Sequence, residues 1–297
     1  MPVIRSAFCS VATQRGVCAM TESSGVSRPI LLAASGDDND AAARIVAVDI
    51  ATRSGAPLHV VHVWHPSTAP GSLSGTVLAA HAASTMAATV QAITDIGGKV
   101  AATHLRQGGD ADRVLAVANG LHPAVMVVGS RSGSAVQRLF RDSAAEEMVR
   151  RSGWPVLVVP GDGLSWPPPE VVVGDDGGKD STLVVSTGAW LARVLGAPCR
   201  LVATQGRDPV LSDATIAKHA RLVTVTAGEE PDVVTVTATG HAAARILENA
   251  APDALVVVGR RWPGRIDARE KRTSAALLHH HHGPCLIVPR PLSAASS

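Results

Sequence analysis

The chain has 297 residues, which suits one large domain or two domains of about 100 to 150 residues that each bury a core. Its formal net charge is +2, and arginines are spread over both halves, so the sequence excludes a basic stripe for nucleic acid. Hydrophobic residues make up 46% of the chain, but the longest apolar runs are as short as strands and well below the roughly 20 residues of a membrane helix. We therefore expect a soluble protein with neither a membrane nor a nucleic-acid partner.

The cysteines and the N-terminal segment indicate the compartment. Cys9, Cys18, Cys199 and Cys285 have no CxxC spacing, and the last two lie in strand-like apolar runs, so we expect a reducing cytoplasm. Residues 1–28 contain a very short apolar run and no cleavage pattern. We interpret them as a disordered N-terminal extension, within which Met20 is an alternative start.

Apolar runs alternate with helical stretches in the first half, which we place at residues 29–160. The run PILLAAS predicts a strand, and Asp40 is expected to cap a helix that stops at Gly55. The side chains expected on the apolar face of that helix are Ile45, Val46, Val48 and Ile50.

The same alternation continues to the end of the first half. It predicts a parallel sheet covered by helices on both faces. The further expected elements are a strand at 57–64, a helix at 76–96, a strand at 99–105, a helix at 110–119, a strand at 124–128, a helix at 136–151 and a strand at 155–159.

The unit from Ala124 to Pro160, a buried run ending in Gly, a polar loop and a second buried run, occurs again near the C-terminus. There ALVVV begins at Ala254 and PCLIV ends before Pro289. A supersecondary unit used twice indicates internal duplication. The stretch GDGLSWPPPE then predicts a linker at 161–169, because its prolines continue neither a helix nor a strand.

The second half is placed at residues 170–291, with a short tail at 292–297. It is expected to contain a strand at 171–174, a helix reaching Leu195, a strand at 233–237 and a helix at 241–249. Its middle helix and entry loop are expected to be reduced around Gln205 to Ala227. This reduction predicts that one sheet face loses helical cover and that the second half is the less stable one.

The two halves align in sequence. Ser35 to Gly55 spans 20 positions and so does Asp176 to Gly196, and each pair is followed by Ala-Pro and a strand. This order and spacing resembles a tandem universal stress protein. The resemblance implies an α/β fold of two Rossmann-like domains, similar to the adenine nucleotide alpha hydrolase group, each with an open parallel five-stranded sheet and helices on both faces.

Many members of that family bind ATP in a loop written as Gly, two residues, Gly, nine residues, Gly and then Ser or Thr. Glycines let backbone amides approach the phosphates, and the next helix N-terminus favours negative charge. In the first half Gly129 and Ser143 match this loop, but Ser132 and Asp142 stand at the second and third glycines. Ser35 occupies the position where the family has an Asp near the adenosine end of the ligand.

The second half departs from the same pattern in a complementary way. Asp176, Gly259 and Thr273 match the adenosine-end Asp, the first glycine and the final hydroxyl, whereas Trp262 and Arg272 replace the other glycines. Trp262 is expected to fill or cover the place of a triphosphate. This half is therefore interpreted as a structural partner.

The resemblance thus implies a candidate, degenerate nucleotide site and three residues that block it. Arg131 is included as a phosphate partner, although a solvated helix face is the simpler interpretation. The candidate binding residues are Ser35, Val61, Gly129, Arg131, Ser132, Gly133, Ser143, Asp176, Gly259 and Thr273, and the blocking residues are Asp142, Trp262 and Arg272.

The histidines suggest a metal site only weakly. His279 to His282 lie near Cys285, but only two of four consecutive imidazoles can share a helix face, and a helix C-terminus favours partly protonated histidine. We therefore expect no metal. His62, on a predicted strand, is interpreted as a buried, hydrogen-bonded core residue.

We interpret the protein as a non-enzymatic regulator or adaptor in bacterial stress response. An ATP-binding regulator with slow hydrolysis, using the loop after Gly129, is the alternative, and a flavin-binding or electron-transfer relative stays open. An enzyme has little support, because the sequence has no nucleophile elbow and no paired carboxylates placed for acid–base chemistry. ATP is the one cofactor considered, and the resemblance leaves a homodimer through sheet edges open.

Overall fold

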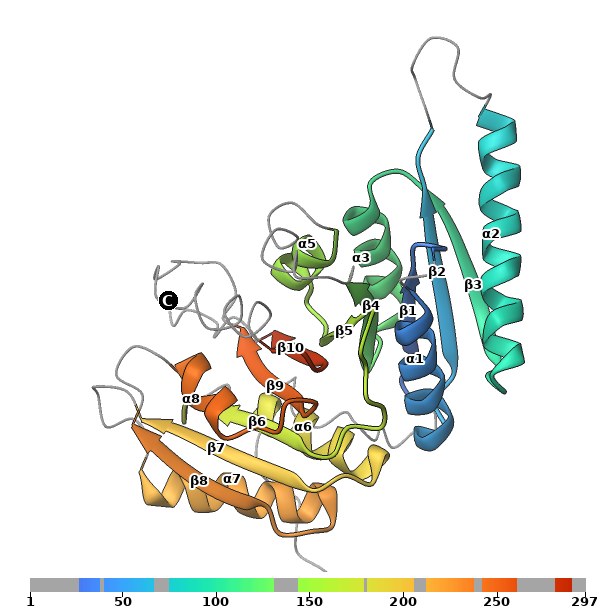
Figure 1. Ribbon diagram of the computed structural model, residues 1–297. Coiled ribbons are helices and arrows are strands. Elements are labelled where there is room, and N and C mark those ends of the chain that lie inside the picture. The colour runs from blue at the N-terminus through green and yellow to red at the C-terminus, as the bar shows by residue number, and fades with distance from the viewer. Residues whose placement is uncertain are drawn as a thin grey trace, which may run out of the picture.

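A computed structural model gives the arrangement of the chain (Figure 1). It describes residues 27–37, 40–66, 75–130, 144–178, 181–205, 212–237, 242–260 and 281–289. The first half contains β1 (Ile30–Ala34), α1 (Ala41–Ser54), β2 (Leu58–Trp64), α2 (Gly75–Asp95), β3 (Val100–Gln107), α3 (Asp110–Leu121), β4 (Val125–Ser130), α5 (Ala144–Arg151) and β5 (Val156–Pro160). The second contains β6 (Val171–Asp175), α6 (Ser181–Leu195), β7 (Cys199–Gln205), α7 (Asp213–Ala227), β8 (Asp232–Thr237), α8 (Ala242–Glu248), β9 (Leu255–Arg260) and β10 (Cys285–Pro289).

The strands form one ten-stranded sheet in the order β3-β2-β1-β4-β5-β10-β9-β6-β7-β8. Neighbours within each half are parallel, and the pair β5 and β10, which joins the halves, is antiparallel. Helices α1, α2, α6 and α7 pack into the core on one face, and α3, α5 and α8 pack into the core on the other. The predicted α/β fold with helix-covered parallel sheets is confirmed.

The central strands are buried because their apolar runs face helices on both sides. All five residues of β6 are buried, as are all five of β10. Such strands read as continuous apolar runs instead of alternating ones. This explains why AVMVV and PVLVV identify β4 and β5 from sequence, whereas β3, an edge strand with alternating exposure, is less distinct.

The join between the halves has a local two-fold pattern. In the antiparallel pair, Leu286 lies opposite Leu157, with Cys285 opposite Val158 and Ile287 opposite Val156. Leu157 and Leu286 occupy corresponding positions of the two halves and are both fully buried. The halves thus meet through the same strand of each, related by rotation about the point between these two leucines.

Polar contacts add to this join on both sides of the sheet. Arg53 Nη1 of α1 donates to the carbonyl of Leu195 at the end of α6 (3.3 Å). Arg260 of β9 donates through Nη1 to the Arg150 carbonyl and through Nη2 to the Ser152 carbonyl, the latter at 2.8 Å. Side chains from each half therefore bond to the backbone of the other.

The linker packs against the first half. The indole Nε1 of Trp166 donates to Asp49 Oδ2 of α1 at 2.9 Å, and Trp166 and Leu164 pack against the main core. Asp49 also holds Arg53 at 2.7 Å. The Pro-rich segment is thus docked onto α1 next to the second half.

Three details of the helices differ from the sequence-based prediction. Asp40 precedes α1 but makes no side-chain cap, because its carboxylate accepts from the Gly36 amide instead (2.7 Å). Ile45 is 46% exposed, since the buried face of α1 is built from small alanines together with Val46 and Ile50. These features reflect tertiary contacts that a helical wheel alone does not specify.

The third difference concerns the middle helix of the second half. The expected loss of helical cover at residues 205–227 is wrong, because α7 runs from Asp213 to Ala227 and packs against α6 and β7. It is shorter than its counterpart α2, at 15 residues against 21. Val223 and His219 of α7 are buried, so the sheet face is covered and no lower stability follows from exposed strand surface.

Among the described residues, one helix meets the length and hydropathy of a membrane span. This is α2, with mean hydropathy 1.2 over an 18-residue window of which 22% is buried. Its alanine-rich sequence accounts for the hydropathy. Met86 and Ile93 of α2 pack into the core over β2 and β3, which assigns it a place in the helical cover of the sheet (Figure 1).

Two helical glycines provide a matched test of the packing. A Cβ at Gly188 of α6 would lie 2.4 Å from Cγ2 of Val173 in β6, whereas a Cβ at Gly120 of α3 meets nothing within 4 Å. Gly188→Ala is expected to destabilise the protein by about 1–3 kcal/mol through overpacking, reduced by the helix propensity of alanine. Gly120→Ala is expected to be neutral or to stabilise by up to about 1 kcal/mol. Urea denaturation measures both, and equal effects would contradict the close approach of α6 to β6.

Candidate functional site

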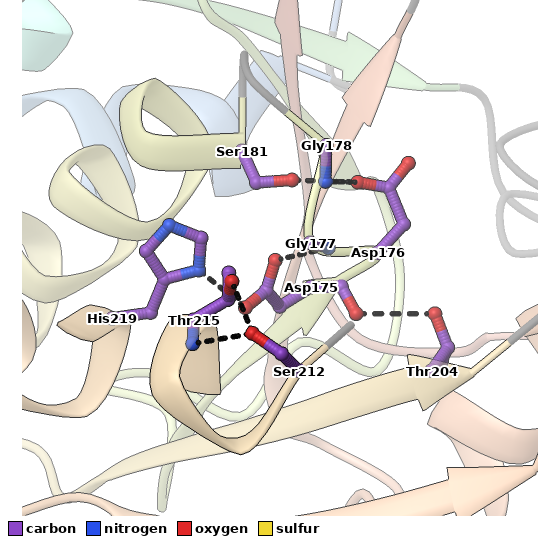
Figure 2. Close-up of polar contacts among 9 residues, drawn as sticks. All are labelled: Asp175, Asp176, Gly177, Gly178, Ser181, Thr204, Ser212, Thr215 and His219. Atoms are coloured by element: carbon purple, nitrogen blue, oxygen red, sulfur yellow. Dashed lines mark hydrogen bonds and ion pairs between the residues drawn. The ribbon is translucent and has the colours of Figure 1, made fainter. Parts of the chain in front are cut away.

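The carboxyl ends of the central strands provide the candidate site. In each half the chain turns in opposite directions from the first strand, with β2 and β4 on either side of β1, and β7 and β9 on either side of β6. Ligands of open α/β sheets bind outside the strand ends at such a switch point. In the second half this position is held by a polar network around the loop between β6 and α6 (Figure 2).

Asp175, the last residue of β6, is the centre of that network. Its side chain is fully buried, and its Oδ2 lies 2.6 Å from Nδ1 of His219, a residue of α7 that is itself 2% exposed. The other carboxylate oxygen accepts from the Gly177 amide at 2.8 Å. A buried carboxylate requires such partners, because desolvation of an unpaired charge costs several kcal/mol.

The neighbouring Asp176 points in the other direction and holds the start of α6. Its Oδ1 accepts from the Gly178 amide at 3.0 Å and from Ser181 Oγ at 2.6 Å. Ser181 is fully buried at the first turn of the helix. These bonds satisfy donors at a helix N-terminus, where a carboxylate is also favoured by the helix dipole.

Helix α7 positions the histidine of the network. Ser212 caps the helix with extended backbone, and its Oγ accepts from the Thr215 amide at 3.2 Å. Thr204 of β7 donates its Oγ1 to the Asp175 carbonyl at 3.1 Å, which fixes the backbone at the end of β6. The position of His219 is therefore fixed by the capped helix α7 and by its contact with Asp175 at the end of β6.

The hydrogen bonds that the side chains of this network already make limit the reactions that it could support. Asp175 orients the imidazole of His219, as carboxylates do in catalytic and metal-binding pairs. The hydroxyl groups of the network donate to other acceptors, Ser181 to the Asp176 carboxylate and Thr204 to the Asp175 carbonyl. In the described part of the chain no group of three His, Cys, Asp or Glu residues could hold a metal ion. The network is built to fix a loop and a helix to each other.

The corresponding loop of the first half packs against side chains of α2 and β2 at Gly36. Gly36 has φ +87°, and a Cβ there would lie 2.1 Å from Cγ2 of Thr85 in α2 and 3.5 Å from Cε1 of His62. His62 is 7% exposed, and its Nδ1 lies 2.9 Å from the Ala34 carbonyl, which confirms a buried, hydrogen-bonded histidine. Burial raises the pKa of Asp40, an effect reduced by its bond from the Gly36 amide.

The structure places five of the candidate nucleotide-binding residues. Ser35 is exposed after β1, and Val61 is buried in β2. Gly129 and Gly259 lie in corresponding strands, β4 and β9, and Asp176 follows β6. The remaining predicted residues lie outside the described part of the chain: Arg131, Ser132, Gly133, Asp142, Ser143, Trp262, Arg272 and Thr273.

Sequence reasoning missed Asp175 and His219. Ser35 and Asp176 do correspond, because β1 and β6 pair in the same register with their neighbours. The fully buried acid is one position earlier, where the first half has Ala34. A carboxylate that ends the apolar run VVVGD, followed by a histidine within a helical segment, was the available signal.

The histidine run and the cysteines are partly described. His281 Nε2 lies 2.6 Å from the Ala254 carbonyl, and burial lowers the pKa of this imidazole; His279 and His280 are outside the described residues. Cys199 and Cys285 are free and buried, and burial raises the pKa of each thiol to about 12. Neither of these thiols is an activated nucleophile.

Partly buried histidines give the protein a pH-dependent stability. Burial lowers the pKa of His59, His104 and His281 below that of the unfolded chain, so protonation favours unfolding. This penalty is absent above the unfolded pKa of about 6.5 and grows as the pH falls through the lower, folded pKa. The free energy of unfolding is therefore expected to decrease between pH 7 and pH 5. The variant His59→Asn/His104→Gln, measured by denaturation at both pH values, should lose less free energy of unfolding between pH 7 and pH 5 than the original protein. A pH dependence equal to that of the original protein would contradict this origin.

Comparison with known proteins identifies the family of the first half. Residues 27–160 match the model of the Universal stress protein family. Residues 27–160 form a universal stress protein domain. The comparison with curated proteins gives no match.

Solved structures agree with this fold over most of the chain. A universal stress protein from Archaeoglobus fulgidus DSM 4304 has a TM-score of 0.70 at 16% identity, covering 89% of this chain and 99% of that one. A proposed universal stress protein from Pseudomonas aeruginosa UCBPP-PA14 has a TM-score of 0.62 at 14% identity, covering 89% and 93%. At such identities the likeness concerns the fold, and it extends beyond the universal stress protein domain into the second half.

Proposed function

We propose that the protein is a non-enzymatic regulator or adaptor of the stress response, built from two universal stress protein domains at 29–160 and 170–291. The observation that carries the proposal is the engagement of Asp175 and Asp176 with groups of the chain itself. By the family resemblance, Asp176 stands at the adenosine end of a nucleotide site. Here its carboxylate holds the start of α6, which supports a structural role.

The first half supports the same proposal from a different set of contacts. Ser35 replaces the adenosine-end Asp, and the adjoining Gly36 is pressed against Thr85 of α2. Asp142 and Ser132 replace two loop glycines, as Trp262 and Arg272 do in the second half. These substitutions in the sequence argue against ATP binding in the manner of the family. We infer action through protein contacts in the cytoplasm, where Cys199 and Cys285 stay reduced.

An ATP-binding regulator is the second candidate, confined to the first half. It is favoured by the placement of the exposed Ser35 and the half-buried Gly129 at the ends of adjacent strands, since β1 and β4 pair from Ile30 with Val125 to Ala33 with Val128. This is the switch point at which open α/β sheets bind nucleotides. The loop that would hold phosphates carries Asp142, whose charge would repel them.

Isothermal titration calorimetry with ATP and magnesium tests the two candidates on the same protein. The regulator without a nucleotide site is expected to give no binding at sub-micromolar ATP, and tight binding would overturn it. The variant Ser132→Gly/Asp142→Gly should then gain ATP affinity only if the first-half crevice is otherwise open. Ser181→Ala, in the second half, is the control that should leave that affinity unchanged.

A further inference from the structure

Two imidazoles meet at one end of the sheet, away from the loops described above. His59 lies near the start of β2, and His104 lies in the edge strand β3. Their ring nitrogens, Nδ1 of His59 and Nε2 of His104, are 3.1 Å apart. The rings are stacked, with centroids 5.3 Å apart and planes inclined by 20°.

The strand register accounts for this meeting. In the β2–β3 pair, His59 is opposite Ala102 and Val61 is opposite His104. Alternate residues of a strand face the same side, so His59 and His104 are diagonal neighbours on one face, within reach of long or aromatic side chains. Both are half-buried, which leaves one side of the pair open to solvent.

The chemistry of the pair is that of two neutral nitrogen donors. Burial lowers the pKa of both rings, and the charge of Arg106 lowers that of His104 further. In the described part of the chain neither ring has a carboxylate within ion-pair distance. The two facing nitrogens share one N–H···N hydrogen bond. When the donating ring carries its hydrogen on its other nitrogen, both facing nitrogens present a lone pair.

The separation of the nitrogens matches that of two ligands on one metal ion. Metal–imidazole bonds of about 2.0–2.1 Å place two nitrogens about 2.9 Å apart at a right angle and about 3.4 Å apart at a tetrahedral angle. The observed 3.1 Å lies between these values. We propose that His59 and His104 form a two-histidine chelating site for one divalent transition-metal ion.

The rest of the coordination shell comes from outside this pair. No third His, Cys, Asp or Glu of the described residues completes a ligand set, so water or a ligand from another molecule takes the open positions. Arg106 opposes the bound cation, which makes the site one of moderate affinity. Imidazole donors select nickel, copper, zinc and cobalt over magnesium and calcium.

Calorimetry with Ni²⁺ tests the proposal on the full chain. The histidine run would also bind nickel, so the parent for the experiment is the variant His279→Gln/His280→Gln/His282→Gln, which keeps His281 because it bonds to the Ala254 carbonyl. One nickel site is expected in this parent. Removing one ligand abolishes chelation, so His59→Ala and His104→Ala should each weaken it about a hundredfold. His81→Ala, which removes an exposed histidine of α2, should leave it unchanged.

Two further measurements keep the test decisive if an alanine variant folds poorly. Arg106→Gln should strengthen nickel binding by up to about fivefold, since it removes an exposed repulsive charge. Nickel should also raise the melting temperature of the parent but not that of His104→Ala, because a ligand of the native state stabilises it. The proposal would be overturned if the parent showed no nickel site, if either His59→Ala or His104→Ala bound nickel as tightly as the parent, or if Arg106→Gln bound it more weakly.

Discussion

Asp175→Ala is expected to lower the free energy of unfolding by about 3–5 kcal/mol, which is the cost of removing one partner of a buried ion pair or charged hydrogen bond. The variant leaves the 2%-exposed His219 without its acceptor and the Gly177 amide without its carboxylate. Against a typical total stability of about 5–15 kcal/mol, this loss is large. Urea denaturation should show a lower midpoint with an unchanged slope.

Matched variants compare the stability contribution of the buried pair with that of an exposed ion pair. Asp232→Ala removes a carboxylate that is 62% exposed and lies 2.9 Å from Arg200, and it should cost under about 1 kcal/mol. Asp175→Asn keeps a side-chain oxygen for the Gly177 amide and should cost less than Asp175→Ala. If Asp175→Ala and Asp232→Ala had equal effects, the network around β6 would not hold the second half together.

Leu286→Ala is expected to cost about 3–5 kcal/mol, a range set by the lost transfer free energy and the cavity left behind. Leu286 is fully buried in β10, opposite Leu157 of β5, and belongs to a core cluster that contains residues of both halves. Because that core is continuous, the loss should appear in a single unfolding transition monitored by circular dichroism and calorimetry.

The control for this prediction lies at the other end of the sheet. Val233 of the edge strand β8 is 37% exposed, and Val233→Ala should cost less than about 1 kcal/mol. A Leu286→Ala protein that unfolds in two separate steps would indicate that the halves are held together more weakly than each is held internally.

The order of elements was predictable because buried parallel strands and amphipathic helices leave strong, local signals. The runs at β4, β5, β9 and β10 are continuous and apolar, and Gly55 and Gly196 end helices with left-handed backbone. Helix α7 was underestimated because Thr and charged residues on its exposed face obscure a buried side built from few residues.

The candidate site was predicted only in part, because its contacts join residues far apart in the chain. The spacing from Asp176 to Gly196 aligned Asp176 with Ser35, and the strand registers give the same correspondence. The bond between Asp175 and His219 crosses 44 residues, and no local pattern predicts it. The His59–His104 pair depends likewise on the register between β2 and the edge strand β3, which shifts between Leu58 and His59 of β2.

The two-fold join at Leu157 and Leu286 has a consequence for how this protein assembles. Two separate chains meeting through such a strand would part on dilution, whereas here the linker keeps both copies of the surface in one molecule. The pairing is thus independent of protein concentration, and each copy is always matched with its complement. The two halves can therefore differ in sequence at corresponding positions. The second half carries Asp175 and Asp176 where the first carries Ala34 and Ser35, a difference that a symmetric pair of identical chains cannot have.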